Sequence, residues 1–194
     1  MPTVTTAARL HFGFQNLSLA HERLYGGVGL ALDEPRLTVE ATRAETVQCD
    51  DAATEPYVRR VVDALDVPGA AVSVEERFPR HVGLGSGTQL SLATLIAVVR
   101  AYDRTADART YAPQLGRGGR SGIGVAAFES GGFVVDGGHP TERFTAEPPA
   151  EGDWDVPPVL AHHDVPSHWR FVVVVPDTDP GQSGSAEDQS MRQA

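Results

Sequence analysis

The feature that most restricts the fold of this chain is the segment from Gln89 to Tyr102, which is apolar on nearly every side. Its Leu, Ile, Val and Ala side chains fall on all faces of a 3.6-residue period, which is typical of a helix buried on most of its surface. The most apolar stretch, Leu90 to Val99, is too short to span a bilayer. The sequence therefore predicts a central helix that the rest of the chain must cover.

Two hydrophobic periods alternate along the remainder of the chain. The two-residue period of strands runs through Leu10–Phe14, Val28–Leu32, Leu37–Ala41, Val72–Val74 and Phe133–Val135. A tight turn is expected at Gly26 and Gly27, before the second of these strands. Helices are predicted over Thr54–Leu65, where Asp50 and Asp51 lie just upstream, over Ala106–Leu115, and from Ser121 onward. We therefore expect the α+β fold class.

The composition changes after residue 146. Glu147 to Asp164 is rich in Pro, Glu and Asp, which favours a connection between domains. Phe171–Val175 then predicts a strongly apolar strand, followed by only about twenty polar, Gly- and Ser-rich residues. We expect a domain over residues 1–146, a linker over 147–166, and the incomplete beginning of a C-terminal domain over 167–194. This expectation implies a truncated product or a partner that supplies the missing half.

Charge and composition exclude several classes of protein. The 194 residues include 26 acidic and 16 basic ones, a net charge of -10, which argues against nucleic-acid binding through a general basic face. An apolar fraction of 41% argues against disorder, and the single cysteine, Cys49, argues against a disulfide scaffold and is expected to be a structural or surface thiol. No signal peptide or membrane span is visible, so we expect a soluble, cytoplasmic protein without a membrane partner. The complete absence of lysine suggests a halophilic, salt-adapted surface; arginine-favouring codons of a high-GC genome are the alternative.

A glycine-rich segment precedes the central helix. It contains Gly83, Gly85, Ser86, Gly87, Thr88 and Gln89. Glycines let the backbone approach a ligand closely, and the unpaired amides at a helix start favour an anion such as phosphate or pyrophosphate. The alternative is a turn in which Ser86 or Thr88 merely caps the helix. The pattern is neither a Walker A loop nor a dinucleotide fingerprint in its usual setting.

A second glycine-rich segment, Gly116–Gly124, carries two arginines. Arg117 and Arg120 each offer a planar fork of donors suited to phosphate or carboxylate, and they form a positive island in an acidic chain. The alternative is that both are solvated loop charges.

A third segment, Gly131–His139, places Asp136 at the end of a strand. A carboxylate there can bind Mg²⁺ or face a developing cation, although a turn-forming Asp is the commoner case. His139, His11 and Arg23 stand in similar glycine-containing contexts and could line the same cleft. The neighbouring His162 and His163 lack the spacing of metal ligands and are expected in a solvated loop.

Four of these segments occur together in an order that resembles a known family. They are Arg9-Leu10-His11-Phe12-Gly13, Arg23-Leu24-Tyr25-Gly26-Gly27-Val28-Gly29, Gly83 to Ala93, and Gly116 to His139. This order is similar to the GHMP kinase superfamily and, within it, to archaeal β-ribofuranosylaminobenzene 5'-phosphate synthases. The resemblance implies a domain of the ribosomal protein S5 domain 2-like fold, a mixed sheet with helices on one side, followed by a ferredoxin-like domain of which only the start is present.

The resemblance also implies an enzyme of methanopterin biosynthesis. In the implied reaction phosphoribosyl diphosphate condenses with 4-aminobenzoate or 4-hydroxybenzoate and releases pyrophosphate and CO₂. Pyrophosphate and magnesium are then expected at the segment from Gly83 to Gln89, with Arg117 and Arg120 on phosphate or the aromatic carboxylate and Asp136 on Mg²⁺ or the ribosyl cation. The other substrate-binding candidates are Ser121, His11, Arg23 and His139, and the superfamily allows a homodimer.

The more telling departure of this chain from the kinases that it resembles is at Gly124. Many of them place a catalytic aspartate where this chain has Gly124. Without that carboxylate nothing obvious orients the proton of an attacking hydroxyl, which disfavours kinase chemistry. An ATP-dependent small-molecule kinase and a truncated, non-catalytic fragment are the two alternatives.

Overall fold

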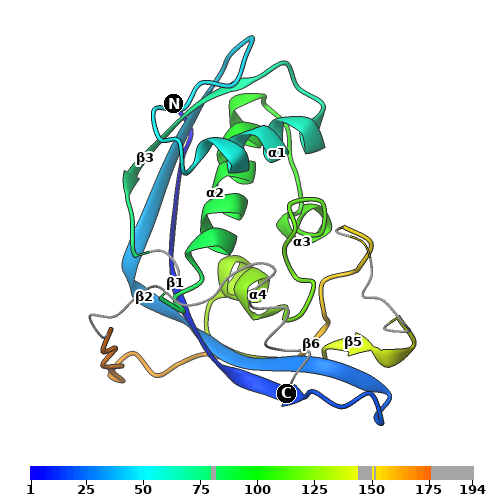
Figure 1. The fold of residues 1–194 in the computed structure, drawn as a ribbon. Coiled ribbons are helices and arrows are strands. Elements are labelled where there is room, and N and C mark those ends of the chain that lie inside the picture. The colour runs from blue at the N-terminus through cyan, green and yellow to red at the C-terminus, as the bar shows by residue number, and fades with distance from the viewer. Residues whose placement is uncertain (80–81, 144–149, 151, 176–194) are drawn as a thin grey trace.

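A single long strand, β2 (Arg23–Arg43), organises the sheet in the computed structural model, which describes residues 1–79, 82–143, 150 and 152–175. Along one edge β2 pairs with β1 (Thr3–Asn16), from Thr3 opposite Glu40 to Asn16 opposite Tyr25. Along the other edge it pairs with β3 (Ala70–Glu76), β4 (Phe133–Asp136) and the short β5 (His139–Pro140). These pairings are all antiparallel, and the strand order is β1-β2-β4-β6 with β3 and β5 also on β2 (Figure 1). A parallel pairing occurs in the described residues only as the isolated bridge between Gln48 and Ala71.

The prediction of two strands, Val28–Leu32 and Leu37–Ala41, was wrong because both belong to β2. The intervening polar residues are largely exposed but remain extended. The turn predicted at Gly26 and Gly27 was also wrong, since Gly27 lies within the strand opposite Phe14 and the chain reverses between Asn16 and Arg23. These glycines serve a close tertiary contact instead, described below.

The α-helices of the described residues lie on one side of the sheet (Figure 1). They are α1 (Glu55–Leu65), α2 (Ser86–Ala101), α3 (Ala108–Tyr111) and α4 (Ile123–Ser130). The predicted central helix is confirmed as α2: Leu92, Leu95 and Val98 are completely buried. The α3 helix is shorter than predicted: Ala112 at its C-cap keeps a helical conformation, and Pro113, which has no amide hydrogen to donate, follows it.

The start of α1 depends on Asp51, as its position upstream of the helix predicts. The Asp51 carbonyl accepts from the amides of Thr54 and Glu55, and its carboxylate accepts from the Thr54 hydroxyl and from Arg77. The hydrogen bonds from Thr54 and Arg77 lower the pKa of Asp51 to about 2. Its neighbour Cys49 is half-buried, with its thiol directed at the Asp51 carbonyl 3.6 Å away.

The proline-rich part of the chain is more ordered than a simple connection. Val159–His163 form β6, which pairs with β4, so this part of the predicted linker is a strand of the sheet. His162 and His163 are therefore in an exposed edge strand and not in a loop. The rest of that linker includes residues 147–149 and 151, which lie outside the described residues, and the domain boundaries stay predictions.

The strand predicted at Phe171–Val175 was wrong. This segment is in neither a helix nor a strand, and Val172 and Val174 are 90% and 82% exposed. An apolar sequence becomes a strand only where a neighbouring strand accepts its backbone hydrogen bonds, and none pairs with it in the part of the chain that the structure describes. Residues 176–194 lie outside the described residues. Among the described helices, none has both the length and the apolar character needed to cross a membrane.

Candidate functional site

The glycine loop, residues 83–89, leads directly into α2. Gly83 and Gly85 have φ of 83° and 80°, in the left-handed region that glycine adopts without strain. Gly85 is the N-cap of α2 and has no side chain, so the alternative in which Ser86 or Thr88 caps the helix is not what forms. The first amides of α2 thus receive no N-cap side chain, and they carry the positive end of the helix dipole.

Arg9 of β1 fixes the shape of the glycine loop. Its amide donates to the Leu84 carbonyl at 3.0 Å, and its guanidinium donates to the Gly83 carbonyl. Leu84 is only 4% exposed and anchors the loop in the core. Sequence reasoning missed Arg9 as a site residue, although it stands on the polar face of the alternating segment that includes His11.

Arg117 brings the second segment to the same place. We call residues 116–122 the arginine loop. A Cβ added to Gly87 would lie 3.4 Å and 3.6 Å from the two terminal guanidinium nitrogens of Arg117, so this cation lies against the first turn of α2. The Arg117 Nε donates to the Ser91 hydroxyl at 3.2 Å, and the guanidinium lies 5.4 Å from the centre of the Tyr57 ring. The two segments predicted to bind an anion therefore lie together. Arg120 is half-buried in the arginine loop.

Gln89 supports this convergence from inside the protein. Its side chain is completely buried, accepts from the Thr6 hydroxyl at 2.6 Å and donates to the Gly124 carbonyl at 2.9 Å. The start of α4 is thereby held beside α2, and a Cβ on Gly124 would lie 3.1 Å from the Thr88 methyl group. Gly124 is thus closely packed against Thr88 and carries no carboxylate.

Asp136, at the end of β4, holds the other side of the arginine loop. It is completely buried. One carboxylate oxygen accepts from the Ser121 hydroxyl at 2.8 Å and the Gly122 amide at 2.9 Å, and the other accepts from the Gly138 amide at 2.9 Å. His11 lies 3.2 Å from the Ser121 oxygen through its Nε2. Because the Ser121 proton is directed at Asp136, this hydroxyl acts as part of the loop's support.

Gly27 of β2 makes room for this network. A Cβ at that position would come within 2.7 Å of both an Asp136 carboxylate oxygen and the Ile123 side chain, and closer still to the Ser121 hydroxyl. Only a residue without a side chain lets β2 pass so near to Asp136.

The surroundings of Asp136 do not fit a resident magnesium ion. Both of its oxygens already accept hydrogen bonds, and its burial leaves no face to solvent or substrate. Mg²⁺ needs several oxygen ligands with open access. Among the described residues no group of three His, Cys, Asp or Glu side chains could hold a metal ion. The binding of Mg²⁺ by this chain stays a prediction.

Arg23 and His139 also contact the backbone of the neighbouring loops. Arg23 donates to the carbonyls of Gly137 and Gly138, the latter at 2.6 Å. His139 is 2% exposed, its Nε2 lies 3.0 Å from the Gly118 carbonyl, and its burial lowers its pKa below 6.5. At neutral pH the ring is therefore uncharged and donates through Nε2.

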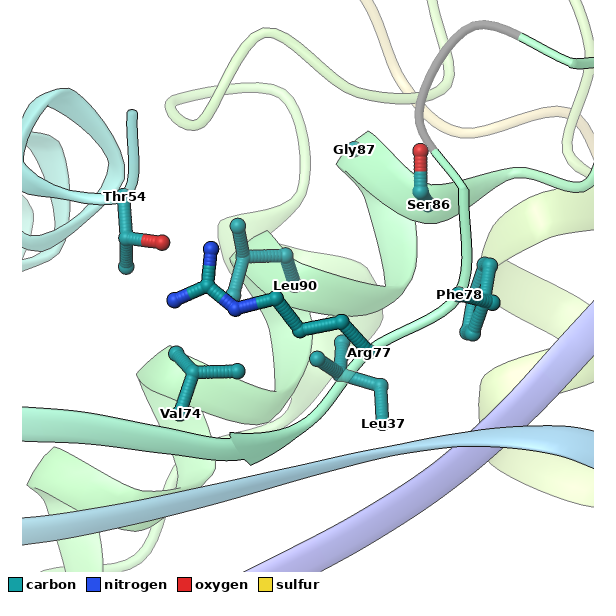
Figure 2. A pocket seen from close by; sticks show the side chains of 8 residues that line it. All are labelled: Leu37, Thr54, Val74, Arg77, Phe78, Ser86, Gly87 and Leu90. Carbon is teal, nitrogen blue, oxygen red and sulfur yellow. The ribbon is translucent and has the colours of Figure 1, made fainter. Parts of the chain in front are cut away.

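An apolar pocket adjoins the start of α2. Figure 2 shows its lining, which consists of Leu37, Thr54, Val74, Arg77, Phe78, Ser86, Gly87 and Leu90. The Arg77 side chain extends across it toward Thr54 (Figure 2), and its guanidinium pairs with Asp51 at 2.6 Å. Gly87 thus borders both this pocket and the Arg117 guanidinium.

Comparison with known proteins identifies the relatives of this chain. Residues 53–132 match the family model described as the GHMP kinases N terminal domain. The chain is 37% identical to the β-ribofuranosylphenol 5'-phosphate synthase of Methanothermobacter thermautotrophicus and 38% identical to that of Archaeoglobus fulgidus. These matches cover 95% and 91% of this chain. The chain is thus similar to these synthases and, over residues 53–132, to the N-terminal domain of GHMP kinases.

The matches to these synthases cover 60% and 58% of the relatives' own length. The fold is also that of solved kinases: a Streptococcus pneumoniae phosphomevalonate kinase, in complex with phosphomevalonate and AMPPNP, matches with a TM-score of 0.55 at 12% identity over 74% of this chain and 51% of the kinase. The predicted α+β fold class is therefore confirmed, and residues 53–132 of the predicted N-terminal domain match the GHMP kinases N terminal domain. The ferredoxin-like second domain stays a prediction.

Proposed function

We propose that this chain binds phosphoribosyl diphosphate and joins its ribose carbon to the ring of 4-hydroxybenzoate, with release of pyrophosphate and CO₂. The observation that carries the proposal is the position of the Arg117 guanidinium against Gly87, which creates one polyanion site from helix amides and a cation. The relatives are named for a ribofuranosylphenol 5'-phosphate, and a phenol is what 4-hydroxybenzoate leaves once its carboxyl group is lost. That name favours the hydroxy acid over the amino acid as acceptor.

In the proposed reaction the main tasks of the protein are to stabilise the leaving anion and to position the two substrates. The bond between the ribose C1 and the pyrophosphate oxygen breaks, and its electron pair leaves with pyrophosphate. The first amides of α2 and the Arg117 guanidinium stabilise that developing charge, and Arg120 adds positive charge from the same loop. The ring carbon that bears the carboxylate attacks C1, and loss of CO₂ returns the electron pair to the ring and restores its aromaticity.

Several predicted site residues take supporting roles in this proposal. Asp136, Ser121 and His11 hold the arginine loop, and Gln89 holds α2 beside α4. Asp136 is thus assigned to positioning, and no step is assigned to a metal ion.

The test is turnover by the chain with phosphoribosyl diphosphate and 4-hydroxybenzoate, measured as equal amounts of pyrophosphate and CO₂. Removing both loop arginines in the Arg117→Ala/Arg120→Ala variant should lower kcat/KM by at least about 100-fold, since each removes a charged hydrogen-bond donor from the diphosphate. Arg36→Ala is the matched control, because Arg36 is an exposed residue of β2 that pairs with Glu34.

Three outcomes would contradict the proposal. Consumption of ATP with a small-molecule acceptor would indicate a kinase. Unchanged kinetics in the double variant would refute the role of the arginine loop. Absence of both turnover and pyrophosphate binding would indicate a non-catalytic fragment.

A further inference from the structure

The arginine loop is covered on its outer side by a segment that sequence patterns do not connect with any site. This segment, residues 152–158, lies just before β6. The Trp154 indole donates from Nε1 to the Arg117 carbonyl at 2.9 Å. A Cβ added to Gly119 would lie 3.0 Å from the Trp154 ring, so the ring lies directly on the loop backbone.

Val156 and Pro157 extend this contact along the loop. Val156 is 8% exposed, and a Cβ added to Gly118 would lie 2.9 Å from its side chain. A Cβ on Gly122 would lie 3.0 Å from the Pro157 carbonyl, which also accepts from Arg109 at 3.0 Å. The glycines of the arginine loop thus allow the covering segment to lie close to it.

The covering segment is itself anchored to the strand that holds the inner side of the loop. The Gly137 amide donates to the Pro158 carbonyl at 2.8 Å, and Val159 of β6 pairs with Asp136 of β4. Asp136 fixes Ser121 and Gly122 from the inside, and Trp154 fixes Arg117 from the outside. The arginine loop is therefore held on one side by Asp136 of β4 and on the other by Trp154, which lies just before β6. The strands β4 and β6 pair with each other.

We propose that Trp154 is a positioning residue that holds Arg117 against the first turn of α2. The inference rests on the proposed function, because it assigns Trp154 an effect on a diphosphate that Arg117 binds. The indole fixes the backbone from which the Arg117 side chain extends, and that side chain reaches Gly87 on the opposite side. A shift of this backbone moves the guanidinium relative to the helix amides, which weakens their joint hold on one anion.

The experiment measures the affinity of the purified chain for inorganic pyrophosphate by titration calorimetry. Trp154→Phe keeps an aromatic ring but removes the donor to Arg117, and should weaken binding by about fivefold, the value of one neutral hydrogen bond. Gly119→Ala keeps Trp154 but pushes its ring away from the loop, and it should also weaken pyrophosphate binding. The chain has two tryptophans, and Trp169→Phe is the matched control because Trp169 is 57% exposed and belongs to no part of the site.

A double-mutant cycle separates positioning from a general loss of structure. In an Arg117→Ala background, Trp154→Phe should change the affinity by less than about twofold, because its effect passes through Arg117. If the fold-losses of pyrophosphate affinity caused by Trp154→Phe and Arg117→Ala simply multiplied in the double variant, the inference would be overturned. Wild-type affinity in both Trp154→Phe and Gly119→Ala would overturn it as well. Failure of the wild-type chain to bind pyrophosphate would overturn the proposed function, and this inference with it; binding by the wild type with no effect of the Trp154 variant overturns the inference alone.

Discussion

The Asp136→Asn substitution tests whether one buried carboxylate holds the arginine loop in place. Asp136 accepts three hydrogen bonds through two oxygens, from Ser121, Gly122 and Gly138. An asparagine has one acceptor oxygen, so in either orientation its NH₂ group faces at least one of these donors. Each lost hydrogen bond to a charged group is worth about 1.5–3 kcal/mol, and a buried donor left unsatisfied adds about 1–3 kcal/mol.

Replacing the buried carboxylate by a neutral amide also removes the cost of burying a charge, and this offsets part of the lost hydrogen-bond energy. We therefore expect Asp136→Asn to lower the free energy of unfolding by about 3 kcal/mol, a large part of the 5–15 kcal/mol typical of a domain. Urea unfolding followed by circular dichroism measures this difference. Asp155→Asn is the matched control: the Asp155 side chain is 91% exposed and pairs with Arg143, so its loss should cost less than about 1 kcal/mol.

Two results would refute the reasoning about Asp136. The first is a stability of Asp136→Asn within about 0.5 kcal/mol of the wild type, which would mean that the loop does not need the carboxylate. The second is a stabilisation of the wild type by Mg²⁺ that Asp136→Asn abolishes and Asp155→Asn keeps. That result would restore Asp136 as a metal ligand.

Three further predictions concern charge. Asp51→Ala should destabilise the chain by about 1 kcal/mol at neutral pH, with Asp50→Ala as the control. Because the folded-state pKa of Asp51 is lowered from 3.8 to about 2, its contribution is present above pH 3.8 and is lost as the pH falls toward 2; a pH-independent difference in urea midpoint would contradict this. Burial lowers the pKa of His139, so the free energy of unfolding should decrease as the pH falls below 6.5, and less steeply in His139→Gln; identical slopes would be the contrary result. If the net charge of -10 reflects salt adaptation, the melting temperature should rise steeply toward molar KCl, and full stability without salt would remove that hypothesis.

The parts of the fold that sequence could predict are those governed by local periodicity. The buried α2 follows from its apolar composition alone, and α1 from the spacing of Val58, Val61, Val62 and Leu65. The turn at Gly26 and Gly27 was mispredicted because glycine is needed there for a contact with Ser121 and Asp136, which are far along the chain. β6 was missed because a proline-rich flank surrounds it and its order comes from backbone pairing with β4.

The candidate site likewise has features that local sequence predicts and features that it does not. The anion-binding character of the glycine loop and the arginine loop follows from local residue types, whereas their convergence depends on the packing of α2 against α4. The supporting roles of Arg9, Asp136 and Trp154 arise from hydrogen bonds to distant backbone atoms. A single sequence carries no local pattern for such contacts.

The most direct test of the account is a pyrophosphate titration followed by ¹⁵N NMR, with the amides of Ser86 and Gly87 and the Nε of Arg117 observed together. If one diphosphate is held jointly by the helix start and the arginine loop, all three signals shift with the same dissociation constant. A response from only one of these two groups, or different midpoints for the two, would contradict the central claim.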